Sequence, residues 1–263
     1  MNPLLCPVCQ KQLYRKDKQF VCKKDHTFDV AKEGYTNLLQ KSSKTTGDSK
    51  EMVVARSNFL QRGYYQPLCN AIIDVLSTLH PTILVDAGCG EGYYTNTLQN
   101  RILGNYYAFD MSKYALRYAS KKNRDVNYFL ASIFHLPIAK QSVDVILNIF
   151  APIATKEFIR VLKDDGYIIK VDPGENHLLE LKGLLYDKVY LNEVKTIQNL
   201  QLILSKRIAY KMQLDDNDIK NLLFMTPYLH RTPKAKIEEL KITGLFEVSA
   251  SFILNVYKKV KIE

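Results

Sequence analysis

The sequence predicts an α/β fold: a mainly parallel sheet with helices on both faces, preceded by a small metal-binding module. Short apolar runs alternate with helical patterns, and the first of them ends in an acidic, glycine-rich turn. Three cysteines and a histidine are clustered near the N-terminus. The chain has 263 residues, enough for one ordinary domain plus a small appendage. Strands are expected at 83–85, 106–110, 127–130, 143–148 and 166–171.

Composition narrows the classes of partner. The formal net charge is +10 and the pI is about 9.2, and residues 1–50 carry half of the excess. This favours a polyanion such as nucleic acid, or an anionic membrane surface, although solvated lysines alone also give a basic chain. No run approaches the roughly 18 apolar residues of a membrane helix, and no secretory signal is visible. We therefore expect a cytoplasmic protein.

The N-terminal cysteines follow the spacing of a structural zinc site. Cys6 and Cys9 form one pair, and Cys22 and His26 form a second pair, with twelve residues between Cys9 and Cys22. Zinc in structural sites takes four tetrahedral sulfur and nitrogen ligands from two such pairs. A redox pair of Cys6 and Cys9 would leave the second pair without a role. We expect residues 1–38 to form a zinc-ribbon-like module that folds with one zinc ion.

Cations and rings alternate with these ligands. The cations are Lys11, Arg15, Lys16, Lys18, Lys23 and Lys24, and the rings are Tyr14, Phe20 and Phe28. The cations could hold phosphates while the rings stack on unpaired bases. Alternatively, the rings are the module's own core and the lysines its solvated rim. We favour the core for the rings and leave both readings open for the lysines.

The acidic, glycine-rich turn indicates a nucleoside-type cofactor. Asp86 ends the strand, and Gly88, Gly90 and Gly92 follow at alternate positions, with Glu91 between the last two. Glycine permits positive φ and a close approach of the backbone to a ligand. An ordinary strand-to-helix loop is the alternative. The spacing differs from the G-x-G-x-x-G dinucleotide fingerprint and from the G-x-x-x-x-G-K-[ST] loop that binds nucleoside triphosphates. It resembles motif I of the Rossmann-like methyltransferases, which bind S-adenosylmethionine.

Asp110 supports the same interpretation. It ends the next predicted strand, about 20 residues past the loop, where an acid that binds ribose is expected. Alternatively, Asp110 caps the helix predicted at 113–122.

Other candidate residues follow from sheet geometry. Ligands of open α/β sheets lie at the carboxyl ends of the strands, which places Ser132, the 148–152 turn and Asp172 on the same rim. Ser132 takes the position where many related enzymes hold an acid that contacts adenine. Phe150 could stack on a purine, although a buried core position is the alternative that we favour. Asp144 starts its strand and is expected to be structural.

The order of the motifs resembles the 23S ribosomal RNA guanine-N1 methyltransferases of the RlmA type. The zinc motif comes first, then the D-V-A-K-E-G-Y-T-N-L-L stretch from Asp29, and then the glycine turn. The resemblance spans nearly the whole chain. Its stretches are 29–39, 47–52, 55–56, 63–68, 86–95, 151–152, 173–174, 177–178, 180–184 and 225–227.

The resemblance implies a reaction and a site. The chain would transfer a methyl group from S-adenosylmethionine to N1 of a guanine in a stem-loop of 23S rRNA, as a homodimer. It implies cofactor contacts at Tyr65, Gly90, Glu91 and His177. A histidine can bond the methionine carboxylate of the cofactor, although His177 could simply open a helix at 176–185. Asp172 is a candidate base; a backbone carbonyl or water is the alternative.

Two other functions remain open at this point: a methyltransferase for tRNA or a small molecule, and an RNA-binding factor with an inactive methyltransferase fold. The identity of the guanine is also open.

The remaining segments complete the expected organisation. Residues 39–64 are expected to be a polar linker at 41–50 and a helix at 51–61. Residues 65–263 would form the methyltransferase domain, which begins with a helix at 65–79. After residue 190 the sequence suggests strands at 202–212 and 246–258 and helices at 215–224 and 234–243.

Overall fold

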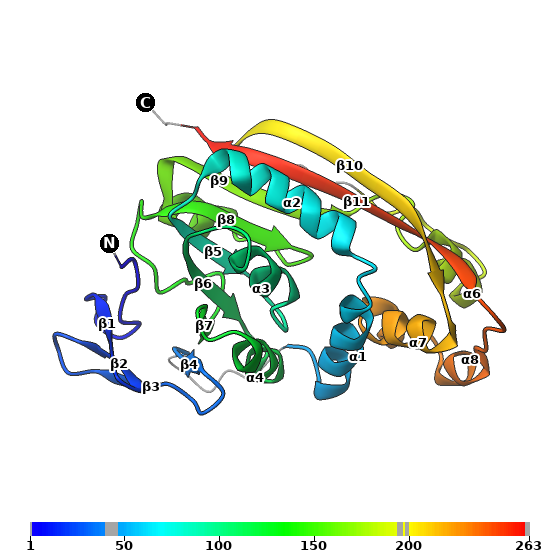
Figure 1. The fold of residues 1–263 in the computed structure, drawn as a ribbon, viewed down its shortest axis with the longest axis horizontal. Helices are drawn as coiled ribbons and strands as arrows, with labels where there is room; N and C mark the ends of the chain where they lie inside the picture. Colours follow the sequence, from blue (N-terminus) through cyan, green and yellow to red (C-terminus); the bar gives the residue numbers. More distant parts are fainter. Residues whose placement is uncertain (1, 40–46, 194–196, 198–199, 261–263) are drawn as a thin grey trace.

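A computed structural model describes residues 2–39, 47–193, 197 and 200–260. Its centre is an eight-stranded sheet in the order β10-β11-β9-β8-β5-β6-β7-β4 (Figure 1). The neighbours from β9 to β4 pair in parallel, whereas β11 is antiparallel to both β9 and β10. The strands are β4 (Tyr35–Asn37), β5 (Ile83–Ala87), β6 (Asn105–Asp110), β7 (Asn127–Leu130), β8 (Val143–Ile149), β9 (Leu162–Pro173), β10 (Leu200–Leu214) and β11 (Phe246–Lys259).

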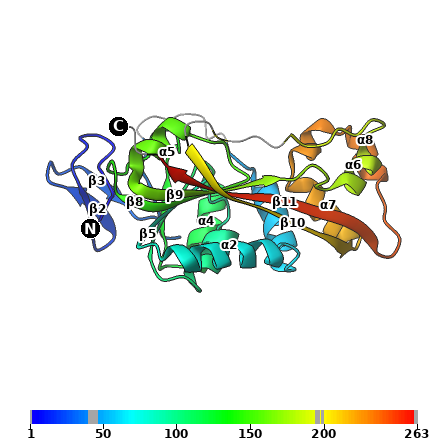
Figure 2. The ribbon, with the colours of Figure 1, turned by 90° about the horizontal axis from the view of Figure 1, so that it is seen from above.

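Helices cover both faces of this sheet, which confirms the predicted fold class. Figure 2 shows α5 (Thr155–Val161) on one face and α2 (Gln66–Leu79) on the other. Two buried clusters match these faces: Leu68 and Ile72 of α2 belong to one, and Phe158 and Val161 of α5 to the other. The other helices are α1 (Lys50–Gln61), α3 (Tyr93–Gln99), α4 (Lys113–Lys122), α6 (Leu179–Leu185), α7 (Asp216–Phe224), η1 (Pro227–Arg231) and α8 (Lys234–Glu239).

The N-terminal module is a small antiparallel sheet of β1 (Leu13–Lys16), β2 (Gln19–Cys22) and β3 (Thr27–Asp29). The next strand, β4, leaves this sheet and pairs in parallel with β7 at the edge of the main sheet. The chain before β1 is also attached to the domain, because the Leu5 N–H donates to the Pro137 carbonyl at 2.8 Å.

We expected the module's rings to form its own core, and this is wrong for Phe20. Leu4, Leu13 and Phe20 belong to the same buried cluster as Phe109 and Phe129 of the main sheet. The rings of Phe20 and Phe129 meet edge to face, with centroids 5.4 Å apart. A segment of this size has few apolar side chains, so it buries them against the larger surface beside it. The predicted boundary at residue 38 falls just after the strand that joins the two parts.

Several predicted elements have different ends. The strand expected at 166–171 extends from Leu162 to Pro173, and the helix expected at 176–185 begins only at Leu179. The expected linker lies partly outside the described residues, but Gly47 to Ser49 are described and lead directly into α1. No helix in the described part of the chain is long and apolar enough to cross a membrane.

Candidate functional site

The glycine turn connects β5 to α3 and has three positive φ angles, at Gly88 (+96°), Gly90 (+55°) and Gly92 (+80°). A Cβ at Gly88 would lie 2.6 Å from the Cβ of Ala151, so this glycine allows the turn to contact the loop after β8. In the described part of the chain, and apart from its chain neighbours, a Cβ at Gly90 would meet only Arg56, at 3.7 Å. The backbone at Gly90 therefore borders open space, as expected where a ligand approaches.

Asp110 is bonded to the glycine turn. Its Oδ2 accepts the Gly90 N–H at 2.9 Å, and its Oδ1 accepts the Ser112 N–H at 2.7 Å. The helix cap is Ser112, whose hydroxyl accepts the Ala115 N–H at 3.2 Å, so the alternative that Asp110 caps α4 is wrong. Burial raises the pKa of Asp110, while the two N–H groups favour its ionised form.

Two further acids of the turn are buried. The Asp86 carboxylate is 2% exposed and accepts the Thr95 hydroxyl at 2.5 Å, which ties the end of β5 to α3. Burial raises the pKa of Asp86 to about 7. Glu91 is 3% exposed, and its Oε1 has no hydrogen-bond partner in the described part of the chain. Burial raises the pKa of Glu91, and the Arg56 charge partly opposes this.

Tyr65 and His177 lie side by side although they are 112 positions apart, with Tyr65 Oη 3.4 Å from His177 Nε2. The Ser251 N–H donates to His177 Nδ1 at 3.2 Å, so the proton of the neutral ring is on Nε2. Burial, with a contribution from the Lys182 charge, lowers the pKa of His177 to about 3. His177 precedes α6, which starts at Leu179, so the alternative of a helix position is wrong.

Phe150 is not a core residue, contrary to the reading that we favoured. It is 41% exposed and has a φ of +53°, a strained conformation for a residue with a side chain. Its ring borders those of Tyr65, Tyr94, His177 and Phe252, with centroids 5.7–6.5 Å apart. This aromatic group connects the start of α3 to His177.

The ends of β8 and β9 carry a second polar group. Asn148 Nδ2 donates to the carbonyls of Ala87 and Pro152, which fixes the loop after β8. Asp172 pairs with Lys170 on the same strand, and its Oδ2 has no partner among the described residues. Asp144, at the other end of β8, accepts the N–H groups of Thr82 and Ile83, as expected for a structural acid.

Ser132 lies elsewhere on the rim. Its hydroxyl accepts the Phe134 N–H at 3.2 Å. It lines a groove of about 470 Å³ between the main sheet and the module, where Pro7 and Gln10 form part of the wall. The rim around Ser132 is still continuous with Asp110, because the Ala131 N–H donates to the Asp110 carbonyl at 3.2 Å.

The four predicted metal ligands meet. The three thiols and the His26 Nδ1 all lie within 4.8 Å of one another. Cys9 Sγ is 3.6 Å from Cys22 Sγ, and His26 Nδ1 is 3.4 Å from Cys22 Sγ. Sulfur ligands about 2.3 Å from a tetrahedral zinc are separated by roughly this much. The donor set and its spacing therefore fit one structural zinc ion and leave no ligand position open.

The rim also fits a nucleoside cofactor with a polar tail. Buried polar atoms without a partner among the described residues include Glu91 Oε1, the Tyr94 hydroxyl and Asn148 Oδ1. Such atoms are costly unless a ligand or water satisfies them. Together with the open backbone at Gly90 and the Asp110 carboxylate, they give hydrogen-bonding groups along the carboxyl edge of β5, β6 and β8.

Sequence reasoning gave no role to two residues near this rim, Asp48 and Arg56. Both fall in stretches on which the family resemblance rests. Asp48 lies in the predicted polar linker and Arg56 in the predicted helix, and neither pattern indicates a contact with the glycine turn. Thr95 was also missed as the partner of Asp86.

The strand order, the glycine turn with Asp110 and the four-ligand cluster define the class of protein: a class I methyltransferase with an N-terminal zinc ribbon. Residues 4–46 match the family described as "RlmA, N-terminal", a zinc ribbon, and residues 85–170 match a methyltransferase domain. The chain belongs to the family of 23S rRNA (guanine-N1)-methyltransferases, as its relatives indicate.

Two relatives support this assignment. A Bacillus subtilis (strain 168) protein named "Putative 23S rRNA (guanine-N(1)-)-methyltransferase YxjB" is 34% identical over 260 residues, covering 90% of each chain. The 23S rRNA (guanine(748)-N(1))-methyltransferase of Streptomyces fradiae is 29% identical, covering 96% of this chain and 95% of its own. A solved structure from Anaeromyxobacter dehalogenans, described as a "Putative Type II Methyltransferase", shares the fold with a TM-score of 0.50 at 14% identity, covering 73% and 97%.

Proposed function

We propose that this chain transfers a methyl group from S-adenosylmethionine to N1 of one guanine in 23S rRNA. The observation that carries the proposal is the contact of Asp110 with Gly90 at the sheet edge, in a chain that also holds the Cys₃His cluster. The family membership makes ribosomal RNA the substrate class that we favour over tRNA or a small molecule. The intact turn argues against an inactive binding factor.

Within this proposal, each rim residue has a role. Gly88, Gly90 and Glu91 would border the cofactor, and Asp110 would accept hydrogen bonds from its ribose. Tyr65 and the Nε2–H of His177 would hold its carboxylate, and Ser132 would contact its adenine. Asp86 would act indirectly, by fixing the turn through Thr95. The bound cofactor would supply an electrophilic methyl group on a sulfonium.

The chemistry left to the protein is alignment and proton removal. Guanine N1 is on the Watson–Crick edge, so the base must be unpaired or extruded before the reaction. The N1 lone pair forms the new N–C bond as the C–S bond breaks, and the N1 proton leaves to a base. Asp172 is our candidate base, because its Oδ2 has no partner among the described residues and its strand end adjoins the Phe150 loop.

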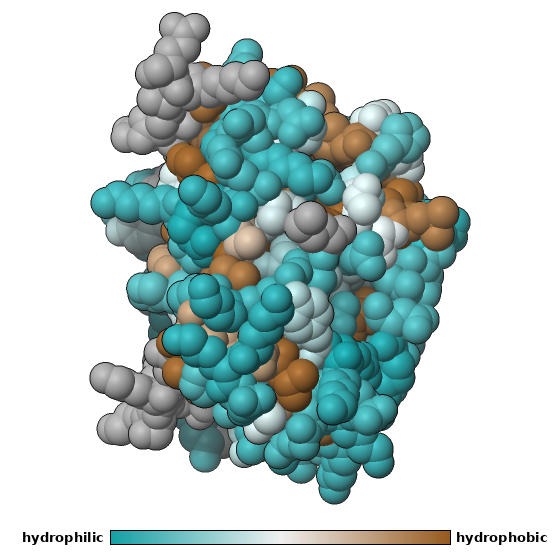
Figure 3. All heavy atoms as spheres, turned by 90° about the vertical axis from the view of Figure 1, so that its left-hand side faces the viewer, coloured by the Kyte–Doolittle hydropathy of each residue, from teal (hydrophilic) through white to brown (hydrophobic). Residues whose placement is uncertain are grey.

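The zinc module would recognise the RNA. All six of its interleaved cations are exposed, and none forms an ion pair with an acid among the described residues. Figure 3 shows the face on this side of the molecule, which is predominantly hydrophilic. Phe20 is buried, whereas Tyr14 is 42% exposed and available to a base. We further propose a stem-loop as the bound element, a homodimer as the active form and the cytoplasm as the location.

The test is methylation of purified 23S rRNA with a labelled methyl donor. We expect label in one guanine, identified by mass mapping, and a reverse-transcription stop there because an N1-methyl group blocks base pairing. Transfer RNA and protein-free cofactor serve as controls. Label in tRNA alone, or cofactor binding without transfer to any RNA, would contradict the proposal.

A further inference from the structure

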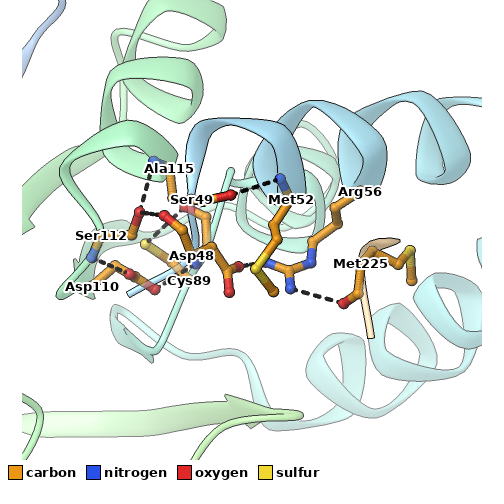
Figure 4. Close-up of polar contacts among 10 residues, drawn as sticks. Asp48, Ser49, Met52, Arg56, Cys89, Asp110, Ser112, Ala115 and Met225 are labelled. Carbon is orange, nitrogen blue, oxygen red and sulfur yellow. Dashed lines mark hydrogen bonds and ion pairs between the residues drawn. The ribbon is translucent and has the colours of Figure 1, made fainter. Parts of the chain in front are cut away.

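Asp48 and Ser49, which lead into α1, lie beside Asp110 and Ser112 of the turn that follows β6 (Figure 4). The Ser112 hydroxyl donates to the Asp48 carbonyl at 2.9 Å. A Cβ on Gly47 would lie 2.7 Å from the Cβ of Ser112, so the two backbones approach closely. Ser49 then caps α1 by accepting the Met52 N–H. Backbone and cap together hold this segment against the residues that follow Asp110.

Arg56, two turns into α1, extends back toward the same place. Its guanidinium pairs with Asp48, and its Nη2 donates to the Met225 carbonyl at the end of α7 at 3.2 Å. Figure 4 shows the side chain between Asp48 and Met225. One cation thus bonds two segments that are far apart in the sequence, the start of α1 and the end of α7.

The position of Arg56 relates it to the proposed cofactor site. Among the described residues other than its chain neighbours, Arg56 Nη1 is the one atom within 4 Å of a Cβ built on Gly90, so it borders the open space there. Burial lowers the pKa of the Arg56 guanidinium. The negative charges of Asp48, Glu91 and Asp110 outweigh this effect, so the pKa is raised. Arg56 therefore offsets acidic charge around a turn where Glu91 Oε1 is buried without a partner among the described residues.

We propose that Asp48 and Arg56 are positioning residues of the methyl-donor site: their ion pair holds residues 47–56 against the Gly90–Asp110 contact and so closes the pocket around the cofactor. The inference rests on the proposed function of that site, and adds a wall from outside the sheet. Arg56 acts here through Asp48, Gly90 and Glu91 rather than on the reacting atoms.

The experiment compares Arg56→Met and Asp48→Asn with the control Arg62→Met. Arg62 ends the same helix, is paired with Asp215 and Asp218 and is 57% exposed. Titration calorimetry with S-adenosylhomocysteine measures binding without RNA. We expect the affinity to fall tenfold or more in Arg56→Met, several-fold in Asp48→Asn, and less than twofold in the control. Arg56→Lys, which keeps the charge, should recover part of the loss.

Kinetics separate positioning from a purely structural role. If the pair positions the cofactor, Arg56→Met raises KM for the methyl donor and leaves KM for RNA unchanged; a stability defect would instead lower the active fraction. The double variant should bind no worse than Arg56→Met alone, because the two residues act as one unit. Cofactor affinity of Arg56→Met within twofold of the wild type would overturn the inference, as would additive losses in the double variant. Failure of the wild type to bind the cofactor would instead refute the proposed function.

Discussion

The zinc cluster and the cofactor rim are held together in different ways. The four zinc ligands come from two short turns within 21 residues, and their donor atoms already face one point. The rim is assembled from strand ends and loops up to 112 positions apart, and several of its buried polar atoms have no protein partner among the described residues. One site depends on a single ion, whereas the other depends on the whole sheet. Because the zinc module and the main domain share one apolar cluster, unfolding of the module also removes contacts that stabilise the main domain.

The largest effect is expected from losing the metal. Cys9→Ser should release zinc and with it the binding free energy, roughly 10–16 kcal/mol in such small modules, that stabilises the folded module. Because Phe20 packs on Phe129, the unfolded module would expose apolar surface of the main domain and lower its melting temperature as well. Zinc analysis and calorimetric unfolding measure both effects.

Cys69→Ser is the control for this change, because Cys69 is buried in α2 and away from the cluster. It should keep its zinc. If Cys9→Ser keeps both its zinc and the melting temperature of the wild type, the comparison between the two regions fails.

The next largest effect is expected at the glycine turn. Gly90→Val should abolish cofactor binding and cost about 1–2 kcal/mol of stability, the strain of a positive φ. Gly88→Val should cost considerably more stability, because its side chain would collide with Ala151. Calorimetry with S-adenosylhomocysteine and urea unfolding of both variants separate ligand clash from protein clash. Unchanged affinity in Gly90→Val would show that the open space there is not the cofactor site.

Asp110→Ala should have an intermediate effect. Removing the carboxylate leaves the Gly90 and Ser112 N–H groups without their acceptor and takes a charged acceptor from the ribose, so we expect a loss of about 1–3 kcal/mol in cofactor binding. The measurement is a cofactor titration at a temperature where the variant is folded. Normal affinity there would reduce Asp110 to a structural role.

Asp86 is expected to change the free energy of unfolding by roughly 2–3 kcal/mol between pH 5 and pH 8. Its pKa is raised to about 7 by burial, so its contribution to stability is complete below pH 4 and is lost as pH rises through 7. Asp86→Asn stays neutral throughout. The free energy of unfolding of the wild type, relative to Asp86→Asn, should therefore fall between pH 5 and pH 8. If the free energies of unfolding of the two proteins change with pH in the same way, folding does not raise the pKa of Asp86.

The same contrast explains what could be predicted from the sequence. Cys6 and His26 could be assigned from spacing because their geometry is local, and Asp86 and Asp110 because strand ends of a parallel sheet meet at one edge. The exposure of Phe150 and the proposed role of Arg56 could not be predicted from the sequence. Both depend on tertiary contacts, such as the bond from Arg56 to Met225 across 169 positions, which no local pattern encodes. The shared core could not be predicted for the same reason. The local sequence suggests that Phe20 is a core residue of the module, and only the fold shows that it packs on Phe129.

The most direct test of the division of labour changes the module's surface and leaves its core intact, because deletion of residues 1–38 would uncover the shared cluster. Lys16, Lys23 and Lys24 are exposed and can be changed to Glu together, with Lys121, Lys156 and Lys206 changed as the control. We predict full zinc content and unchanged S-adenosylhomocysteine affinity. RNA binding should weaken, and methylation should fall in proportion. The slope of log binding constant against log salt concentration should become shallower by roughly 0.7–0.9 for each lost phosphate contact. Wild-type RNA affinity and methylation in this variant would contradict the account.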